Sequence, residues 1–125
     1  MQTGALQIRT LGLLWQIHDA ASYVIEWTRE ASGDITGDHT RTMAIERQVG
    51  VVGEAALRLD ARDPETAKGI PGLEEAVLLL DMLLLEYDNV DYARLTNFVN
   101  TVLPGLDRVA ASLLEQHEHS VPEHL

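Results

Sequence analysis

The sequence predicts an all-α fold, an up-and-down bundle of four or five helices in one domain. Apolar residues recur at spacings of three and four in four long segments, which is the period of an amphipathic helix. No segment alternates apolar and polar residues as a half-buried strand does. Glycine, proline and aspartate gather between the four segments, where turns interrupt helices. A chain of 125 residues fits one domain, which can bury a core without disulfides.

The first predicted helix runs from Leu6 to about Ala31. Its apolar residues stand at positions 6, 13, 14, 17, 20, 21, 24 and 25, which places them on one face. Gly33 follows its end and starts a turn. Trp15 and Trp27 do not share a face closely, and we interpret both as core or interface residues.

The second predicted helix begins near His39, with Asp38 or Thr40 as its N-cap. Gly50 and Gly53 lie inside it, and each lowers helix stability by roughly 1 kcal/mol relative to alanine. We therefore expect another backbone to approach the helix closely at these glycines. Simple tolerance of glycine by a buried helix is the alternative.

Asp63 and Pro64 end the second helix, and Gly69 with Pro71 and Gly72 marks a loop before the third. The third helix is predicted from about Leu73 to Tyr87, and it is apolar on nearly all sides between Ala76 and Leu85. A helix without a polar face must be covered on several sides. Because the core of a small bundle covers only part of such a helix, we expect a homodimer in which a second copy covers the rest.

The last predicted helix runs from about Asp91 to His117 and carries the cleanest apolar stripe. Pro104 falls within it, so we expect a kink or break near Val102 to Leu103. We assign residues 1–116 to the helical domain and residues 117–125 to a polar C-terminal tail.

Charge and composition limit the functions that the chain can serve. Nine Lys plus Arg against twenty Asp plus Glu give a net charge of −11, which disfavours binding to nucleic acid through its phosphates. There is no cysteine, so disulfides and thiolate metal sites are excluded.

No signal-peptide pattern is evident, and the longest apolar stretch is far shorter than the ~20 residues of a membrane span. We expect a cytoplasmic protein without membrane contact.

Four segments resemble the HepT-like family of the HEPN superfamily, whose members are small toxins. Residues 47–59, RQVGVVGEAALRL, resemble the family's "IGEAA" helix. Residues 70–73, IPGL, and 80–91, LDMLLLEYDNVD, resemble its loop, its motif helix and the turn that follows. Residues 103–106, LPGL, resemble its final element. The segments occur in the family's order and together span most of the chain.

This resemblance implies a homodimeric HEPN-type bundle with a metal-independent ribonuclease motif. The motif is an Arg, usually followed by Asn, then a short spacer, a His, and a Tyr two residues after the His. A His with a pKa near neutrality can move a proton on or off a ribose or leaving-group oxygen. An Arg can hold the phosphate and stabilise its developing charge.

The present chain departs from this motif at the residues that carry the chemistry. When the alignment is anchored on Tyr87, the His position falls on Leu85 and the Arg position on Leu80, with Asp81 at the Asn position. A leucine can neither move a proton nor bind phosphate, and residues 76–87 contain no Arg or His. We therefore expect no catalytic residue in this helix. A natural loss and an engineered one would leave the same sequence.

The resemblance also indicates which residues face the cleft between subunits. These are Arg47, Gly50, Gly53, Glu54, Leu80, Leu84 and Leu85. The implied partners are a second copy of the chain and a nucleotidyltransferase-type (MntA-like) antitoxin. In such pairs the motif Tyr receives AMP, so Tyr87 is a possible modification site, with a structural helix-ending role as the alternative. We expect no cofactor and no metal, and RNA binding that is weak or absent.

Two competing hypotheses remain open. In one, the chain is an active ribonuclease neutralised by such an antitoxin, with Arg41, Arg47 or Arg58 as the phosphate contact. His18 beside Asp19 would then move the proton, although a lone His on an amphipathic helix is usually structural. In the other, the chain is a helical subunit of a larger complex, related to the family by fold alone.

A third possible group of functional residues lies near the C-terminus. His117, Glu118, His119 and His124 could bind a metal ion adventitiously. A flexible tail is a poor specific site, so we do not count these residues as ligands.

Overall fold

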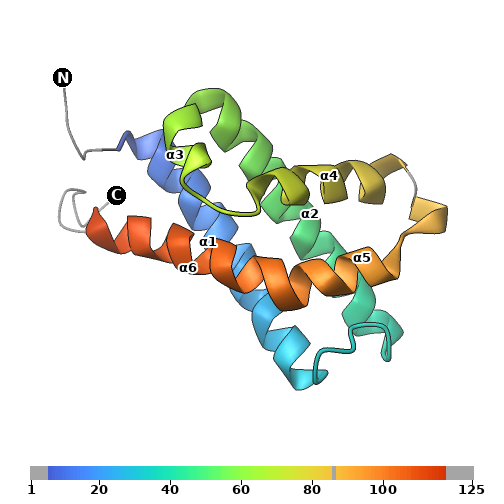
Figure 1. The fold of residues 1–125 in the computed structure, drawn as a ribbon. Coiled ribbons are helices and arrows are strands. Elements are labelled where there is room, and N and C mark those ends of the chain that lie inside the picture. The colour runs from blue at the N-terminus through green and yellow to red at the C-terminus, as the bar shows by residue number, and fades with distance from the viewer. Residues whose placement is uncertain (1–5, 86, 118–125) are drawn as a thin grey trace.

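The computed structural model describes residues 6–85 and 87–117, and every regular element among them is helical, which confirms the all-α prediction. The elements follow one another as shown in Figure 1. They are α1 (Ile8–Glu30), α2 (His39–Arg62), α3 (Pro64–Lys68), α4 (Leu73–Leu85), the 3₁₀ turn η1 (Tyr87–Asn89), α5 (Tyr92–Asn97), the π-helical turn η2 (Phe98–Val102) and α6 (Leu103–Gln116).

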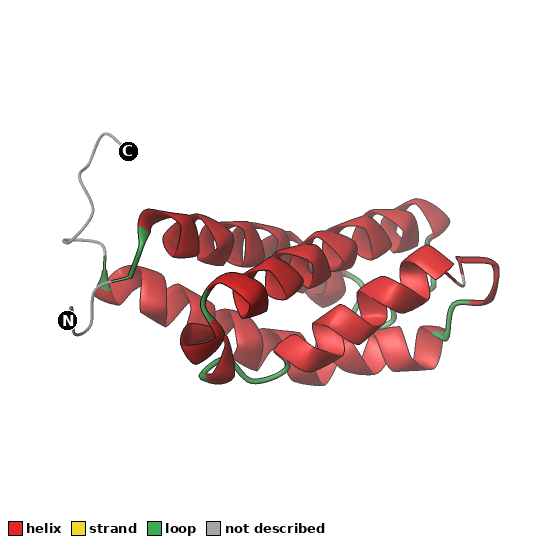
Figure 2. Ribbon diagram, turned by 90° about the horizontal axis from the view of Figure 1, so that it is seen from above, coloured by secondary structure: helices red, strands yellow, loops and turns green. Residues whose placement is uncertain are grey.

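Helices α1 and α2 form the central pair of the bundle. Helix α4 packs against α2, and α6 packs against α1 (Figures 1 and 2). Side chains from all of these helices meet in one apolar core. Its largest fully buried members are Leu14, Ile17, Val24, Ile35, Ile45, Val49, Leu59, Leu79, Leu95, Phe98, Leu103 and Leu106. Because α4 has its main partner on one side only, part of its apolar surface stays outside this core.

The ends of α1 and α2 carry the signals that the sequence predicts. Gly33 adopts a φ of 87°, and its N–H donates to the carbonyl of Thr28 (2.9 Å), which closes the end of α1. Asp38 is the N-cap of α2, and its carboxylate accepts from the N–H of Arg41 (3.0 Å). The predicted start of the second helix is therefore confirmed.

Helix α3 (Pro64–Lys68) lies between the predicted end of the second helix and the predicted loop at Gly69, where we expected no helix. Asp63 ends α2 and is also the N-cap of α3, accepting from the N–H and the hydroxyl of Thr66 (3.1 and 2.7 Å). Pro64 at the first helical position has a φ already suited to a helix. The two residues that stop one helix thus start the next.

Asp63→Ala is expected to lower the free energy of unfolding by about 1–2 kcal/mol, because α3 loses its cap. The change also removes the acceptor of the Thr10 hydroxyl, which lies 3.3 Å from the Asp63 carboxylate. Urea unfolding followed by circular dichroism measures the loss. The control is Glu65→Ala on the same helix, whose exposed carboxylate contacts only Lys68, and which is expected to change stability by less than about 0.5 kcal/mol.

The break predicted near residues 102 and 103 is confirmed as a widened turn, η2. Pro104 lacks an N–H, and its ring would collide with the carbonyl of Asn100 in a regular α-helix. The backbone avoids this collision by forming a π-helical turn from Phe98 to Val102 before α6 begins at Leu103. Helices α5 and α6 therefore continue one another as a single irregular rod (Figure 1).

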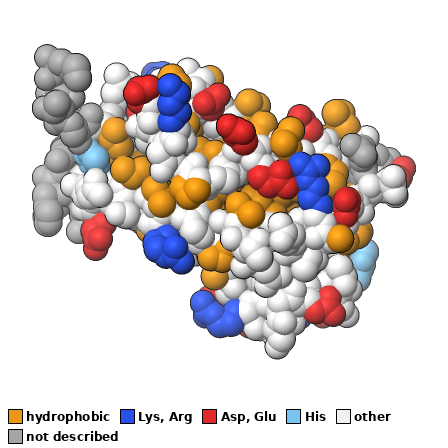
Figure 3. Space-filling model, viewed as in Figure 1, with side chains coloured by type: hydrophobic (Ala, Val, Ile, Leu, Met, Phe, Trp, Pro, Cys, Tyr) orange, Lys and Arg blue, Asp and Glu red, His pale blue; other side chains and the backbone are white. Residues whose placement is uncertain are grey.

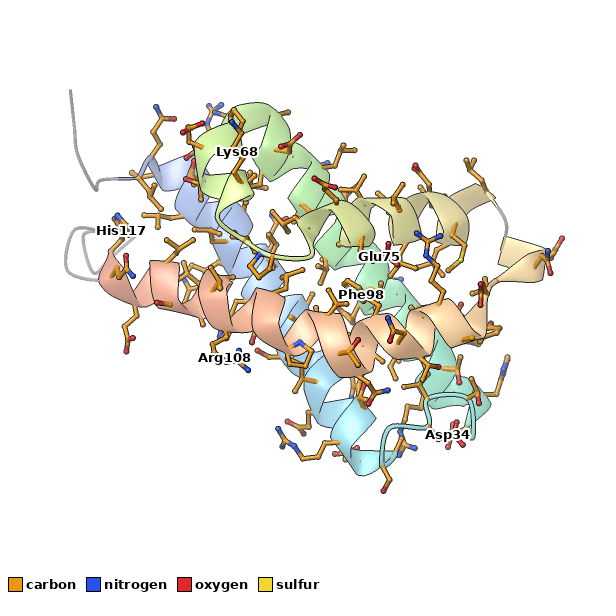
Figure 4. All side chains as sticks on the ribbon, in the orientation of Figure 1. Asp34, Lys68, Glu75, Phe98, Arg108 and His117 are labelled. Atoms are coloured by element: carbon orange, nitrogen blue, oxygen red, sulfur yellow. The ribbon has the colours of Figure 1, made fainter. Side chains whose placement is uncertain are left out.

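An ion pair holds the start of this rod to α4. Arg94 on α5 donates to both carboxylate oxygens of Glu75 on α4, each at 2.9 Å (Glu75 is labelled in Figure 4). The hydrogen bonds from Arg94 lower the pKa of Glu75 from its ordinary value of 4.5.

Glu75→Gln is expected to lower the free energy of unfolding by about 0.5–1 kcal/mol at neutral pH, since about a third of each side chain is exposed. A carboxyl whose pKa is lower when folded stabilises the protein above its unfolded pKa, and this contribution disappears as the pH falls through the folded pKa. The difference between the two proteins should therefore shrink below about pH 4.5. A difference that stays constant from neutral to acid pH would contradict this role for the pair. Parallel denaturation curves across that range measure it.

The C-terminal end of the described chain is packed rather than extended. Helix α6 ends at Gln116, and the next residue, His117, is buried, with its Nδ1 2.9 Å from the carbonyl of Leu113 (His117 is labelled in Figure 4). His117 therefore belongs to the helical body and not to the polar tail to which we assigned it. Glu118, His119 and His124 lie outside the described residues.

Candidate functional site

Helices α2 and α4 are in close contact at Gly53. A Cβ atom at this position would lie 2.6 Å from the carbonyl oxygen of Ala76 and 2.8 Å from the Cβ of Leu80. No side chain fits there unless the helices separate. Gly50 is different, because a Cβ there would meet only the Cδ1 of Leu80 at 4.0 Å, an ordinary contact. The predicted close approach of a backbone is thus confirmed at Gly53 and wrong at Gly50.

A shallow hollow of about 440 Å³ lies beside this crossing. Its lining is Met43, Glu46, Arg47, Gly50, Val51, Glu54, Leu80, Leu83 and Leu84. The structure thus brings together five of the residues that the resemblance assigns to the cleft, from two separate helices. Of the other two, Gly53 lies under Leu80 in the helix crossing, and Leu85 lies outside the lining.

Large apolar side chains on this side of the molecule are open to solvent. Leu85 is 79% exposed and Leu84 is 65% exposed. Leu78 and Leu57 are about half exposed and line a second hollow between the same two helices. Figure 3 shows hydrophobic side chains along the edge over α4, with acidic side chains among them. We call the side chains of Met43, Val51, Leu57, Leu78, Leu80, Leu83, Leu84 and Leu85 the α2–α4 face.

The two degenerate motif positions have different surroundings. Leu80 is half-buried, since it packs across Gly53 within its own chain. Leu85, at the end of α4, is almost fully exposed. Leu85 is therefore open to a partner along most of its side chain, whereas Leu80 has only part of its side chain free. The side chain of Tyr87 lies outside the described part of the structure.

Charged groups surround the hollow unevenly. The Tyr92 hydroxyl donates to Glu46 (2.6 Å), and this bond raises the pKa of Tyr92. Glu54 pairs with Arg58 one turn along α2 at 3.8 Å, with both side chains exposed. Among the described residues that line the hollow, Arg47 is the one cation and none is His. The ionisable groups of the lining are therefore this arginine and the carboxylates of Glu46 and Glu54.

His18 lies elsewhere, between α1 and α6. Its Nδ1 is 2.7 Å from a carboxylate oxygen of Asp107, a partner that we did not predict. The sequence could not show this pair because its members are 89 residues apart. Within the described residues no interaction joins His18 to Arg41, Arg47 or Arg58, the arginines of the alternative ribonuclease site.

The two tryptophans lie in different surroundings, Trp15 at the surface and Trp27 against the core. Trp15 is 58% exposed, and its ring lies 5.8 Å from that of His18, so it is not a core residue. Trp27 is half-buried and stacks on Tyr23, with the ring centroids 5.5 Å apart.

Over residues 6–85 and 87–117, no three His, Asp or Glu side chains come together as metal ligands would. In the same ranges, no helix has the length and hydrophobicity needed to cross a membrane.

Comparisons with family models, curated proteins and solved structures found no match for this chain.

Proposed function

We propose that this chain is a HEPN-type domain of the HepT-like kind whose ribonuclease motif is inactive and which acts by binding a second copy of itself and a partner protein. One observation carries the proposal: the α2–α4 face exposes leucines at the motif end of α4, where the family would place its catalytic groups. Leu84 and Leu85 are 65% and 79% exposed.

Exposed leucines on this scale favour association. Removing one leucine side chain from water stabilises a complex by about 1.5–3 kcal/mol. Single exposed apolar residues are common on monomers, but a continuous apolar surface rimmed by charges is typical of an interface. The α2–α4 face combines exposed leucines with charged neighbours, since Arg47 and Glu54 line the same hollow as Leu80, Leu83 and Leu84, and Asp81 is an exposed residue of α4.

The charges on this face suit a second copy of the same chain. In a two-fold interface, residue i of one copy meets residue j of the other, and the reverse contact forms as well. Arg47 on α2 and Asp81 on α4 are both exposed and have no ion-pair partner within the described residues. Arg47 of each copy can thus face Asp81 of the other across the leucines.

Loss of ribonuclease chemistry follows from the motif positions. Leu80 and Leu85 replace the groups that would hold phosphate and move a proton, and Asp81 would repel a phosphate. We propose no modification at Tyr87, because the activity that AMP transfer would silence is absent. A nucleotidyltransferase-type antitoxin remains the proposed partner by resemblance, and the net charge of −11 favours a basic surface on that partner.

The purified chain is expected to leave RNA uncut, and His18→Ala is expected to behave identically. A gel assay with labelled single-stranded RNA, run with chelator to exclude metal-dependent contaminants, measures this. Cleavage by the unmodified chain that disappears in His18→Ala would overturn the proposal in favour of an active ribonuclease. The self-association half of the proposal is tested by measuring the molar mass in solution.

A further inference from the structure

A third hollow lies between the start of α1 and the end of α2. These two helix ends lie near each other at one end of the bundle (Figure 1). The hollow encloses about 590 Å³ and shares no lining residue with the hollow beside Gly53. Its lining is Arg9, Gly12, Leu13, Gln16, Arg58, Ala61 and Arg62. We call it the arginine hollow.

The arginine hollow is a cationic site on a strongly acidic protein. It gathers three of the nine Lys and Arg residues of a chain with net charge −11, and no Asp or Glu is among the described residues that line it. Within the described residues, Arg9 and Arg62 have no ion-pair partner. Arg58 has only the 3.8 Å contact with exposed Glu54, which contributes little in water.

Nearby carboxylates are directed to other contacts. Asp63, next to Arg62 in the chain, accepts from Thr66 and from the hydroxyl of Thr10. Asp60 lines a different hollow, the one that Leu57 and Leu78 also line. The hydrogen bond between Thr10 and Asp63 also joins the start of α1 to the end of α2, so the two walls of the arginine hollow are fixed relative to each other.

Two lining residues oppose the stability of the helix that carries them. Arg9 lies in the first turn of α1, where a positive charge opposes the helix dipole, and no acidic residue offsets it there. Gly12 lies inside the same helix, where glycine is less stable than alanine. A Cβ at Gly12 would meet no heavy atom within 4 Å, so no packing contact requires a glycine. Positions that oppose local stability without a packing reason are candidates for function.

Helix stability explains only one of the three arginines. Arg62 lies in the last turn of α2, where a cation complements the helix dipole. Arg9 has the opposite relation to its helix, and it lies one turn from Gly12 on the same exposed side of α1. Because Gly12 has no side chain, the hollow is open between Arg9 on α1 and the two arginines of α2.

We propose that the arginine hollow binds the phosphate groups of a small phosphorylated ligand. Guanidinium groups donate two parallel hydrogen bonds to phosphate oxygens, and several arginines around one concave surface are suited to a compact anion. A long nucleic acid fits less well. Its backbone would extend over acidic surface beyond the roughly 8 Å within which the three arginines act at physiological salt.

Isothermal titration calorimetry at low ionic strength tests this proposal with pyrophosphate, with ADP and with a short single-stranded RNA. We expect pyrophosphate or ADP to bind with one ligand per chain and with an affinity that falls as salt is added. ADP binding more tightly than pyrophosphate identifies a nucleotide-like ligand, and the reverse identifies an inorganic polyphosphate. Absence of binding by both, or tighter binding of the RNA than of either, overturns the proposal.

Three variants separate a built site from general attraction. Arg9→Gln and Arg62→Gln are each expected to weaken binding about tenfold or more, through loss of a charge-assisted hydrogen bond. The matched control, Arg108→Gln, removes the same charge from the exposed surface of α6 and should leave the affinity unchanged (Arg108 is labelled in Figure 4). An equal loss in the control would show attraction by net charge alone and would overturn the proposal.

Gly12→Leu fills the hollow and keeps every charge. Because a Cβ at this position has open space around it, the variant is expected to fold with unchanged or slightly raised stability. Binding of pyrophosphate and ADP should fall about tenfold or more. Unchanged binding by a folded Gly12→Leu chain would place the anion elsewhere and would contradict the proposal.

Discussion

Gly53→Ala is expected to lower the free energy of unfolding by about 1–3 kcal/mol, although alanine is the better helix former by about 1 kcal/mol. The reason is that the new Cβ would lie 2.6 Å from the Ala76 carbonyl oxygen and 2.8 Å from the Leu80 Cβ. Neither atom is the end of a flexible side chain, so α4 would have to move away from α2. Urea unfolding followed by far-ultraviolet circular dichroism measures the change.

The matched control is Gly50→Ala, one turn earlier on the same helix. Its Cβ would meet only the Leu80 Cδ1 at 4.0 Å, so the variant is expected to be neutral or more stable by up to about 1 kcal/mol. Equal destabilisation by the two substitutions would mean that the helix crossing is not centred on Gly53. Because Leu80 packs against Gly53, Gly53→Ala should also displace Leu80 and so change the shape of the α2–α4 face. Gly50→Ala should leave that face unchanged.

Leu84→Glu combined with Leu85→Glu is expected to weaken self-association by about a hundredfold or more, while leaving the monomer folded. Two leucines on each of two copies leave water on association, and each contributes up to about 1.5–3 kcal/mol when its burial is complete. Half of the total for the four leucines is about 3 kcal/mol or more, which exceeds the roughly 2.7 kcal/mol that corresponds to a hundredfold change in Kd. The added negative charges of the two copies would also repel one another. Sedimentation velocity over a range of concentrations measures the Kd.

The control for this pair is Ile8→Glu combined with Tyr23→Glu on α1. These residues are 62% and 50% exposed but lie outside the α2–α4 face. The control adds the same charge and removes exposed apolar surface, and it should leave the Kd unchanged. Dissociation by the control and not by the leucine variant would place the interface on α1 instead.

Helical periodicity alone is sufficient to predict the long elements of this fold. The ranges of α1, α2 and α4, and the irregularity before α6, follow from apolar spacing and from Pro104, because these are local properties of the chain. Helix α3 was missed since five residues are too few to display a helical period. Asp63 and Pro64 before it have the residue types of an N-cap and a first helical position, but the same two residue types also end a helix.

Contacts between distant segments were less predictable. Nothing local indicates that His18 pairs with Asp107 on α6. The apolar character of α4 is plain in the sequence, but which of its leucines stay exposed depends on where α2 crosses it. That crossing is set by Gly53, so Leu80 is half-buried while Leu85 is open. The arginine hollow likewise needs the packing of α1 on α2, because its three arginines come from two helices.

The central claim is that the α2–α4 face joins two copies of this chain. Light scattering coupled to size-exclusion chromatography at micromolar concentration tests it most directly. We expect a molar mass of twice 13.8 kDa for the unmodified chain, and 13.8 kDa for the chain that carries both Leu84→Glu and Leu85→Glu. A single species of 13.8 kDa for the unmodified chain would contradict it.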